Sequence, residues 1–147
     1  MGNTDIKYEI GHIAFVVKDL DTAMAFMKAL GAELSEKKNF GNQKNVMEGS
    51  EAPWQVTYCT GKLGNMGLEI FMPEGDGTPY SDFMKKTGGG IHHISFDNLG
   101  ELIVPMRDDL VEKGAVQFSS AESRKHGMMA CYLNVPAMSG TVIELKK

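Results

Sequence analysis

Apolar and polar positions alternate along several short stretches of this chain, a pattern typical of β-strands. The first stretch runs from Tyr8 to Val17 and places His12 on one face and Ile13 on the other. Apolar residues then recur at helical spacing from Leu20 to Leu30, and Gly31 follows as a helix stop. The chain is therefore predicted to open with a strand and an amphipathic helix.

The same arrangement recurs after three consecutive glycines at positions 88–90. A strand is expected from Ile91 to Phe96, and a second amphipathic helix over residues 102–113 ends before Gly114. Each half continues with three further strand-like stretches, at 32–34, 54–60 and 66–72 in the first and at 115–118, 127–134 and 141–146 in the second. This repeat predicts two tandem βαβββ modules, about residues 8–73 and 90–147, within one α+β domain spanning residues 1–147.

Two segments between these elements differ from the repeat. Thr78 and Pro79 are typical of a helix N-cap and first helical position, so a short helix is expected to continue to Lys86. Residues 36–53 are polar and rich in glycine, with little periodicity, so they are predicted to form a long loop that can fold over a site.

The composition excludes several classes of function. The net charge of −4 is spread without long blocks of like charge, which argues against a nucleic acid or an anionic membrane as partner. No apolar stretch approaches the length of a membrane span, and the N-terminal residues lack the apolar core of a signal peptide. Cys59 and Cys131 lie in apolar strands, as expected of buried free thiols in a reducing cytoplasm. We therefore expect a cytoplasmic globular protein.

Histidine and glutamate recur at equivalent positions of the two halves. The first strands share the pattern His-Ile-small-Phe from His12 and from His93, and the last strands share an apolar-Glu-apolar pattern around Glu69 and Glu144. The neighbouring side chains on the opposite face are bulky and apolar at all four places, so the polar residues are expected to converge in a concave cavity. Two imidazoles and two carboxylates would bind a divalent first-row metal and leave positions for water or substrate.

Two adjacent histidines begin the second module. Because strand side chains alternate between faces, His93 is expected to share a polar face with Ser95 and Asp97. His92 would share the opposite, apolar face with Ile94. The prediction is that His93 faces the metal, while His92 packs toward the core or serves as a hydrogen-bonding partner.

These features together resemble the vicinal oxygen chelate superfamily (glyoxalase, bleomycin resistance and dioxygenase proteins), whose paired βαβββ modules form a cupped mixed sheet around a metal site. The resemblance covers residues 11–145. Within the superfamily the chain resembles the methylmalonyl-CoA epimerases through three segments in matching order and spacing, namely Leu68-Glu69-Ile70-Phe71-Met72-Pro73, Thr78-Pro79-Tyr80 on to Lys86, and Gly88-Gly89-Gly90-Ile91-His92-His93-Ile94.

The resemblance implies a ligand set and a cofactor. By position, the metal ligands would be His12, Glu69, His93 and Glu144, holding one divalent ion of Co, Ni, Mn, Zn or Fe per chain. It also implies a homodimer that acts on a small-molecule substrate, either a thioester or a thiol adduct. Nucleic acids and membranes are not expected as partners.

The implied reaction passes through a metal-stabilised enolate and epimerises a 2-substituted acyl-CoA such as methylmalonyl-CoA. A carboxylate must take the α-proton, and Glu144 is one candidate. The epimerases usually carry a further glutamate on the third strand, where this chain has Gln55 and its neighbours but no carboxylate. Glu48 and Glu51, just upstream, are therefore also candidate catalytic residues.

Other functions remain compatible with the same pattern. A glyoxalase I-like lactoylglutathione lyase would use the same ligands and enolate but return the proton to the neighbouring carbon. An extradiol dioxygenase fits less well, because it normally uses two histidines and one glutamate. A non-catalytic small-molecule-binding protein of the superfamily is the alternative from a different class, although such proteins generally lack the metal ligands.

Overall fold

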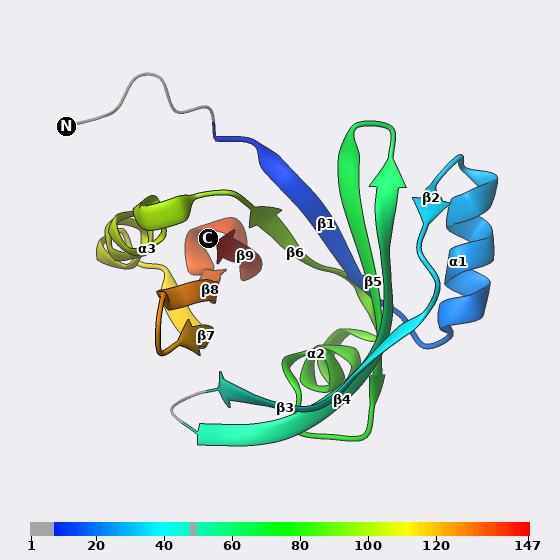
Figure 1. Ribbon diagram of the computed structural model, residues 1–147, viewed down its shortest axis with the longest axis horizontal. Helices are drawn as coiled ribbons and strands as arrows, with labels where there is room; N and C mark the ends of the chain where they lie inside the picture. The colour runs from blue at the N-terminus through cyan, green and yellow to red at the C-terminus, as the bar shows by residue number, and fades with distance from the viewer. Residues whose placement is uncertain (1–7, 48–49) are drawn as a thin grey trace.

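The computed structural model describes residues 8–47 and 50–147, and the side chains of all of these except 40–54. Its main feature is a strongly curved sheet of nine strands in the order β2-β4-β3-β7-β8-β9-β6-β1-β5, in which β5 also pairs with β4 (Figure 1). The strands are β1 (Ile10–Val16), β2 (Glu33–Leu34), β3 (Lys38–Met47), β4 (Ser50–Leu63), β5 (Met66–Glu74), β6 (Gly90–Phe96), β7 (Val116–Ser123), β8 (Gly127–Val135) and β9 (Thr141–Lys146).

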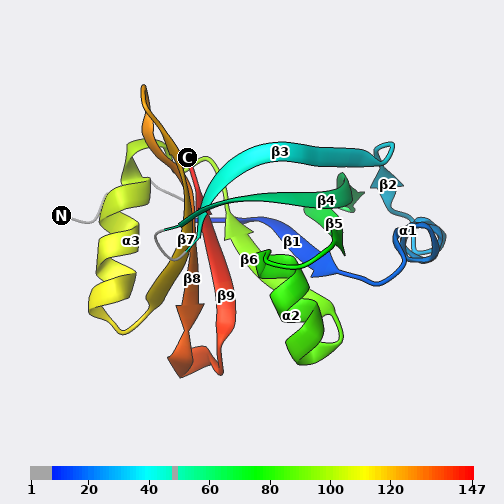
Figure 2. The same ribbon diagram turned by 90° about the horizontal axis from the view of Figure 1, so that it is seen from below.

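Three helices accompany the described strands, namely α1 (Leu20–Ala29), α2 (Pro79–Thr87) and α3 (Ile103–Glu112). Short 3-10 turns precede α3 at Gly100–Leu102 and lie between β8 and β9 at Pro136–Met138. The helices α1 and α3 lie at opposite ends of the molecule, and α2 lies between them (Figures 1 and 2). Within the described residues, no helix is long and apolar enough to cross a bilayer.

The helix boundaries follow from local chemistry that the sequence already displays. The Asp19 carboxylate accepts a hydrogen bond from the Thr22 N–H at 3.1 Å and caps α1. At α2, Thr78 and Ser81 form a reciprocal capping box, and the following Pro79 occupies the first turn. The predicted starts of both helices are confirmed.

The two βαβββ modules are present, and the predicted fold class is confirmed. The second module consists of β6, α3, β7, β8 and β9 in that order. In the first, β2 and β3 pair with successive parts of β4 and together correspond to β7. The strands β1 and β6 pair antiparallel at the centre, and each has the last strand of its own module as a parallel neighbour.

The predicted long loop over residues 36–53 is wrong. This region contains β3 and the start of β4, which pair antiparallel, and the end of β3 continues the sheet because Val46 and Met47 pair with Ser120 and Ser119 of β7. The run is polar and lacks alternation, so its strand character depends on the neighbouring strands that satisfy its backbone groups and not on its own side chains.

Alternate residues of the central strands supply separate cores on the two sides of the sheet. On the outer side, α1 and α3 each cover an apolar cluster of their own module. On the inner side, Ala14, Val16, Val56 and Phe71 pack against α2 through Tyr80. His12 lies on the same inner side of β1 as the buried Ala14, because side chains two positions apart on a strand point to the same face.

Candidate metal centre

The four predicted ligands lie on the four central strands of the sheet. His12 is on β1 and His93 on β6, while Glu69 is on β5 and Glu144 on β9. In both modules, the residue two positions after the histidine lies opposite the glutamate of the neighbouring parallel strand. The internal repeat of the sequence therefore becomes a spatial repeat that directs one histidine and one glutamate of each module toward the same point.

Three of these side chains form a compact group of ligand atoms. The Oε2 atom of Glu144 lies 3.1 Å from the Nε2 atoms of both His12 and His93, and the two Nε2 atoms are 3.2 Å apart. Atoms that coordinate a metal at about 2.1 Å, at right angles to each other, are about 3 Å apart. The spacing of the three atoms therefore suits a shared divalent ion, and within the described residues these three form a group of potential ligands.

The chemistry of this group also fits a cation. All three side chains are buried, and within the described part of the chain Glu144 Oε2 has no hydrogen-bond partner of acceptable geometry. A buried carboxylate oxygen without a partner is costly, whereas coordination to an ion would satisfy it. Imidazole nitrogens and a carboxylate are a donor set that first-row divalent metals accept.

The charges in the group perturb the pKa values strongly. Burial alone lowers the pKa of His12, but the hydrogen bond to Asp97, the close contact with Glu144 and the charge of Glu69 raise it to about 9. Burial alone raises the pKa of Glu144, yet its contacts with the two histidines hold that pKa below its usual range. The site thus concentrates negative charge that a divalent ion would neutralise.

Glu69 occupies a different environment from Glu144. Its Oε2 atom lies 3.3 Å from His12 Nε2, but it is not part of the compact group formed by the other three side chains. The Glu69 side chain is 19% exposed, compared with 6% for Glu144. Burial and the charge of Glu144 raise the pKa of Glu69, although His12 opposes this. Glu69 therefore approaches the centre from its more open side.

The prediction that His92 shares the opposite face of β6 with Ile94 is wrong, because β6 contains a bulge at His92. Ala14 of β1 lies opposite His93, and the next residue of β1 lies opposite Ile91, so His92 is the extra residue. A bulge breaks the alternation of faces. The His92 ring turns to the inside, where it contacts the Tyr80 ring and its Nδ1 lies 2.8 Å from His93 Nδ1. The prediction that it serves as a hydrogen-bonding partner is confirmed.

Sequence reasoning missed Asp97 as a residue of the site. Its Oδ2 atom accepts a hydrogen bond from His12 Nδ1 at 3.0 Å, and its Oδ1 atom accepts one from the Ser95 hydroxyl at 2.5 Å. The available signal was the polar face on which His93, Ser95 and Asp97 alternate. What was lacking was the pairing of β1 with β6, which brings that face beside His12.

Of the two further candidate catalytic residues, the structure describes the backbone of one, Glu51. Glu48 is outside the described residues, and Glu51 belongs to β4, where its backbone lies opposite Val46 of β3. The end of β3 is connected to Glu144 by backbone pairing across the sheet. Met47 lies opposite Ser119 of β7, Ser119 lies opposite Tyr132 of β8, and Tyr132 lies opposite Glu144 of β9. The β3–β4 hairpin is therefore joined through the sheet to the strand that carries Glu144.

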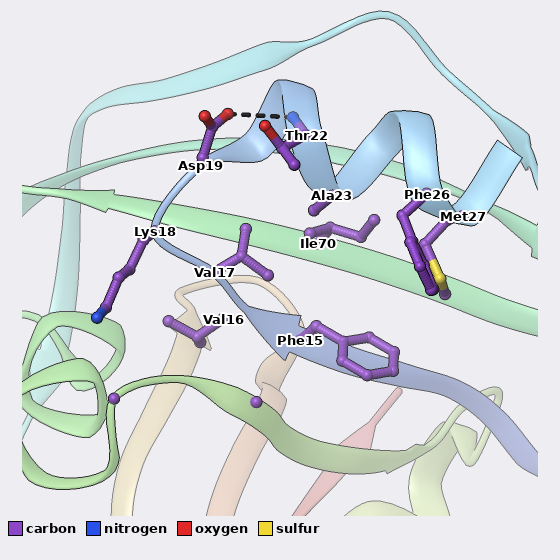
Figure 3. A pocket seen from close by; sticks show the side chains of 12 residues that line it. Phe15, Val16, Val17, Lys18, Asp19, Thr22, Ala23, Phe26, Met27 and Ile70 are labelled. Atoms are coloured by element: carbon purple, nitrogen blue, oxygen red, sulfur yellow. Dashed lines mark hydrogen bonds between the residues drawn. The ribbon is translucent and has the colours of Figure 1, made fainter. Parts of the chain in front are cut away.

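Two hollows border the central strands. One, of about 610 Å³, lies between α1 and the outer side of β1, where Phe15, Val17 and Ile70 meet Phe26 and Met27 (Figure 3). It is separated from the metal centre by β1. The other, of about 560 Å³, is bounded by the second half of α2, the turn before β9, and the two adjacent histidines of β6.

The fold and the His–His–Glu group together define a class of protein. The model of the Glyoxalase/Bleomycin resistance protein/Dioxygenase superfamily matches residues 11–142, and the chain belongs to this family. It is similar to the ethylmalonyl-CoA/methylmalonyl-CoA epimerase of Cereibacter sphaeroides, with 32% identity over 142 residues that cover 94% of this chain and 96% of that protein. It is 28% identical to the mitochondrial methylmalonyl-CoA epimerase of Bos taurus, covering 94% of this chain and 73% of that one.

Solved structures support the same fold. A variant of the methylmalonyl-CoA epimerase of Streptomyces coelicolor in complex with 2-nitronate-propionyl-CoA aligns with a TM-score of 0.66 at 19% identity, covering 94% of this chain and 95% of that one. A hypothetical protein from Bacillus halodurans aligns with a TM-score of 0.69 at 18% identity, covering 96% and 94% of the two chains.

Proposed function

We propose that this protein is a metal-dependent epimerase of 2-substituted acyl-CoA thioesters such as methylmalonyl-CoA. One observation carries the proposal, namely the buried Glu144 oxygen that lies 3.1 Å from the Nε2 atoms of His12 and His93 and lacks a hydrogen-bond partner in the described part of the chain. This arrangement suits a divalent Co, Ni, Mn, Zn or Fe ion. The similarity to acyl-CoA epimerases supplies the substrate class.

The residues have separate roles in this proposal. His12, His93 and Glu144 hold the ion, and Glu69 completes the ligand set from the more exposed side. When bound, the ion stabilises the negative charge that develops on the thioester oxygen as the α-proton leaves. The outer hydrogen bonds of the two histidines fix their rings, so that the ligand atoms stay in place during the reaction.

Epimerisation requires acid/base groups that exchange a proton with both faces of the same carbon, and carboxylates can fill this role. In this proposal Glu144 serves one face, and its support is that its carboxylate lies 3.1 Å from the Nε2 atoms of both histidines and so beside the ion they would hold. The second carboxylate in this proposal is Glu48, outside the described residues, or Glu51 of β4. Its support is that the end of β3 pairs with β7 and so joins the hairpin to the strands around the site.

The comparisons favour an epimerase over the other functions considered. The relatives described above are named acyl-CoA epimerases, and none of those names describes a lyase of thiol adducts. A non-catalytic binding protein would have no use for a buried glutamate placed between two histidines. The hollow beside His92 and His93 also offers space for the acyl-CoA chain, and Lys86 at its edge offers a positive charge for a phosphate.

The proposal includes a homodimer that works in the cytoplasm. Its support is the apolar surface around the outer hollow, where Phe26 is 68% exposed. Contact between two copies would remove such side chains from water. Cys59 and Cys131 are both buried and free, as suits a reducing compartment. Light scattering should give the mass of two chains.

The experiment that tests the function is proton exchange at the α-carbon. Protein loaded with Co²⁺ is incubated with methylmalonyl-CoA in D₂O, and loss of the α-proton signal is followed by NMR. Metal-dependent exchange is expected, because the α-proton must leave before it can return to the opposite face. Protein stripped with a chelator is the control and should show no exchange above background.

The alternatives give different outcomes in the same assay. Exchange with the hemithioacetal of glutathione, and none with acyl-CoA, would replace the epimerase with the lyase. Full metal occupancy with no exchange on either substrate would contradict an enolate mechanism.

A further inference from the structure

We infer that Asp97 is a positioning residue for His12, and that residue 11 is a glycine because its missing side chain leaves room for the Asp97 carboxylate. The inference rests on the proposed function, since it concerns how a metal-binding histidine is held. It adds two residues, one from each module, to the machinery of the site.

The Asp97 carboxylate contacts the His12 ring directly. Asp97 Oδ2 lies 3.0 Å from His12 Nδ1, while the other carboxylate oxygen is held by the Ser95 hydroxyl at 2.5 Å. A hydrogen bond from Nδ1–H to a carboxylate fixes the tautomer of the imidazole, so that Nε2 presents its lone pair. In His12 this Nε2 is the atom that lies 3.1 Å from Glu144.

The contact between Asp97 and His12 requires the space beside Gly11. A Cβ atom built on Gly11 would lie 2.2 Å from Asp97 Oδ2 and 2.4 Å from its Cγ. Any side chain at position 11 would therefore displace the carboxylate from His12. The backbone of Gly11 lies outside the left-handed region that favours glycine, so conformational freedom does not explain this residue. The close approach of Asp97 does.

A bulge precedes each of the two ligand histidines. Gly11 is the extra residue of a bulge in β1, because Ile10 and His12 lie opposite consecutive residues of β6. His92 is the corresponding bulge residue before His93 and bonds to the Nδ1 atom of that histidine itself. Where the bulge residue has a side chain, as His92 does, that side chain holds the following histidine. Where it has none, as at Gly11, Asp97 of the other module holds the histidine.

The positions that correspond to Asp97 agree with this exchange of roles. Asp97 is four residues after His93, and the residue four after His12 is Val16, which is fully buried in the inner apolar cluster. A carboxylate is therefore present only on the side where the bulge is a glycine. Each ligand histidine is thus held at its Nδ1 atom in a different way. Asp97 holds His12 beside the glycine bulge, and His92 itself holds His93, so that a valine can stand at position 16, which is equivalent to Asp97.

A double-mutant cycle tests the inference with metal affinity as the readout. Zinc dissociation constants are measured by competition with a chromogenic chelator for the wild type, Gly11→Ala, Asp97→Ala and the double variant. Each single substitution should weaken binding by about 10- to 100-fold, the usual cost of losing an outer partner of a ligand. The double variant should bind about as tightly as Asp97→Ala alone, because the alanine then has no carboxylate to displace.

Two further variants separate positioning from a general effect on the fold. Gly61→Ala is the matched control, because a Cβ there would lie 2.0 Å from the Glu33 carbonyl oxygen, far from this contact in the sequence. Its effect should add to that of Asp97→Ala. Asp97→Asn keeps an oxygen acceptor and should restore part of the lost affinity, and it remains informative if an alanine variant fails to fold.

The outcomes distinguish this inference from the function on which it rests. Additive losses in the Gly11 and Asp97 cycle, with zinc bound normally by the wild type, would overturn the inference alone. Failure of the wild type to bind any divalent ion would overturn the proposed function. Non-additive losses, with partial rescue by Asp97→Asn, are the result that we expect.

Discussion

The two modules have the same strand order around their histidine and glutamate, yet they surround them differently. His12 is held by a carboxylate from the other module, whereas His93 is held by the neutral ring of its own neighbour. Burial and the charge of His93 lower the pKa of His92 to about 3, so that ring stays uncharged. The repeat therefore conserves the direction of each ligand atom but not the group that fixes it.

The two glutamates show the same contrast. Glu144 of the second module contacts both histidines, while Glu69 of the first contacts His12 and is more exposed. Away from the centre the modules are alike, since Cys59 and Cys131 lie opposite the residues that follow these two glutamates and both are fully buried. The packing layers remain symmetric, and the asymmetry is concentrated where chemistry is expected.

The largest predicted effect separates the two glutamates. Glu144→Gln should reduce the rate of α-proton exchange by about 10³-fold, because it removes a ligand and a candidate base together. Glu69→Gln should cost only about 10-fold, since one of several ligands is weakened. Exchange is followed by NMR in D₂O, with the exposed Glu112→Gln on α3 as control. Equal losses from both site variants would contradict the asymmetry.

A smaller effect distinguishes the two adjacent histidines. His93→Ala removes a ligand and should leave little bound metal after desalting. His92→Ala removes only the outer partner, so it should keep about one ion per chain and lose roughly 10-fold in affinity. Metal content measured by mass spectrometry on the folded variants decides between them. Full retention in His93→Ala would remove this residue from the site.

The smallest effect concerns pH and the metal-free protein. The pKa of His12 is raised from 6.5 to about 9, so its stabilising contribution is complete below pH 6.5 and is lost as the pH rises to about 9. The pKa of His92 is lowered, so its contribution is present above pH 6.5 and is lost toward pH 3. His12→Gln should flatten the alkaline fall of the melting temperature, and His92→Gln the acid fall. The same dependence of melting temperature on pH for the metal-free wild type and both variants would contradict the assigned environments of the two histidines.

Much of the fold could be predicted because the sequence repeats its own pattern. The matching residues around His12 and His93 located both modules, and the helical spacing from Leu20 and the N-cap at Thr78 located two helices. The β3–β4 hairpin could not be predicted in this way, because its polar residues carry no alternation and its pairing comes from β7.

The metal ligands could be predicted from the sequence, but the residues that hydrogen-bond to the ligand histidines could not. A one-residue bulge turns a side chain to the other face, and nothing in the local sequence distinguishes His92 from an ordinary strand residue. The role of Asp97 depends on a hydrogen bond to a residue 85 positions away in the chain. Such contacts follow from strand pairing across the two modules, which a pattern within one module does not contain.

If the two modules share one ion, anomalous X-ray scattering from crystals of the zinc-loaded protein should locate it. We expect a single strong peak within about 2.3 Å of His12 Nε2, His93 Nε2 and a Glu144 oxygen. A peak elsewhere, or one that contacts residues of only one module, would contradict a shared ion.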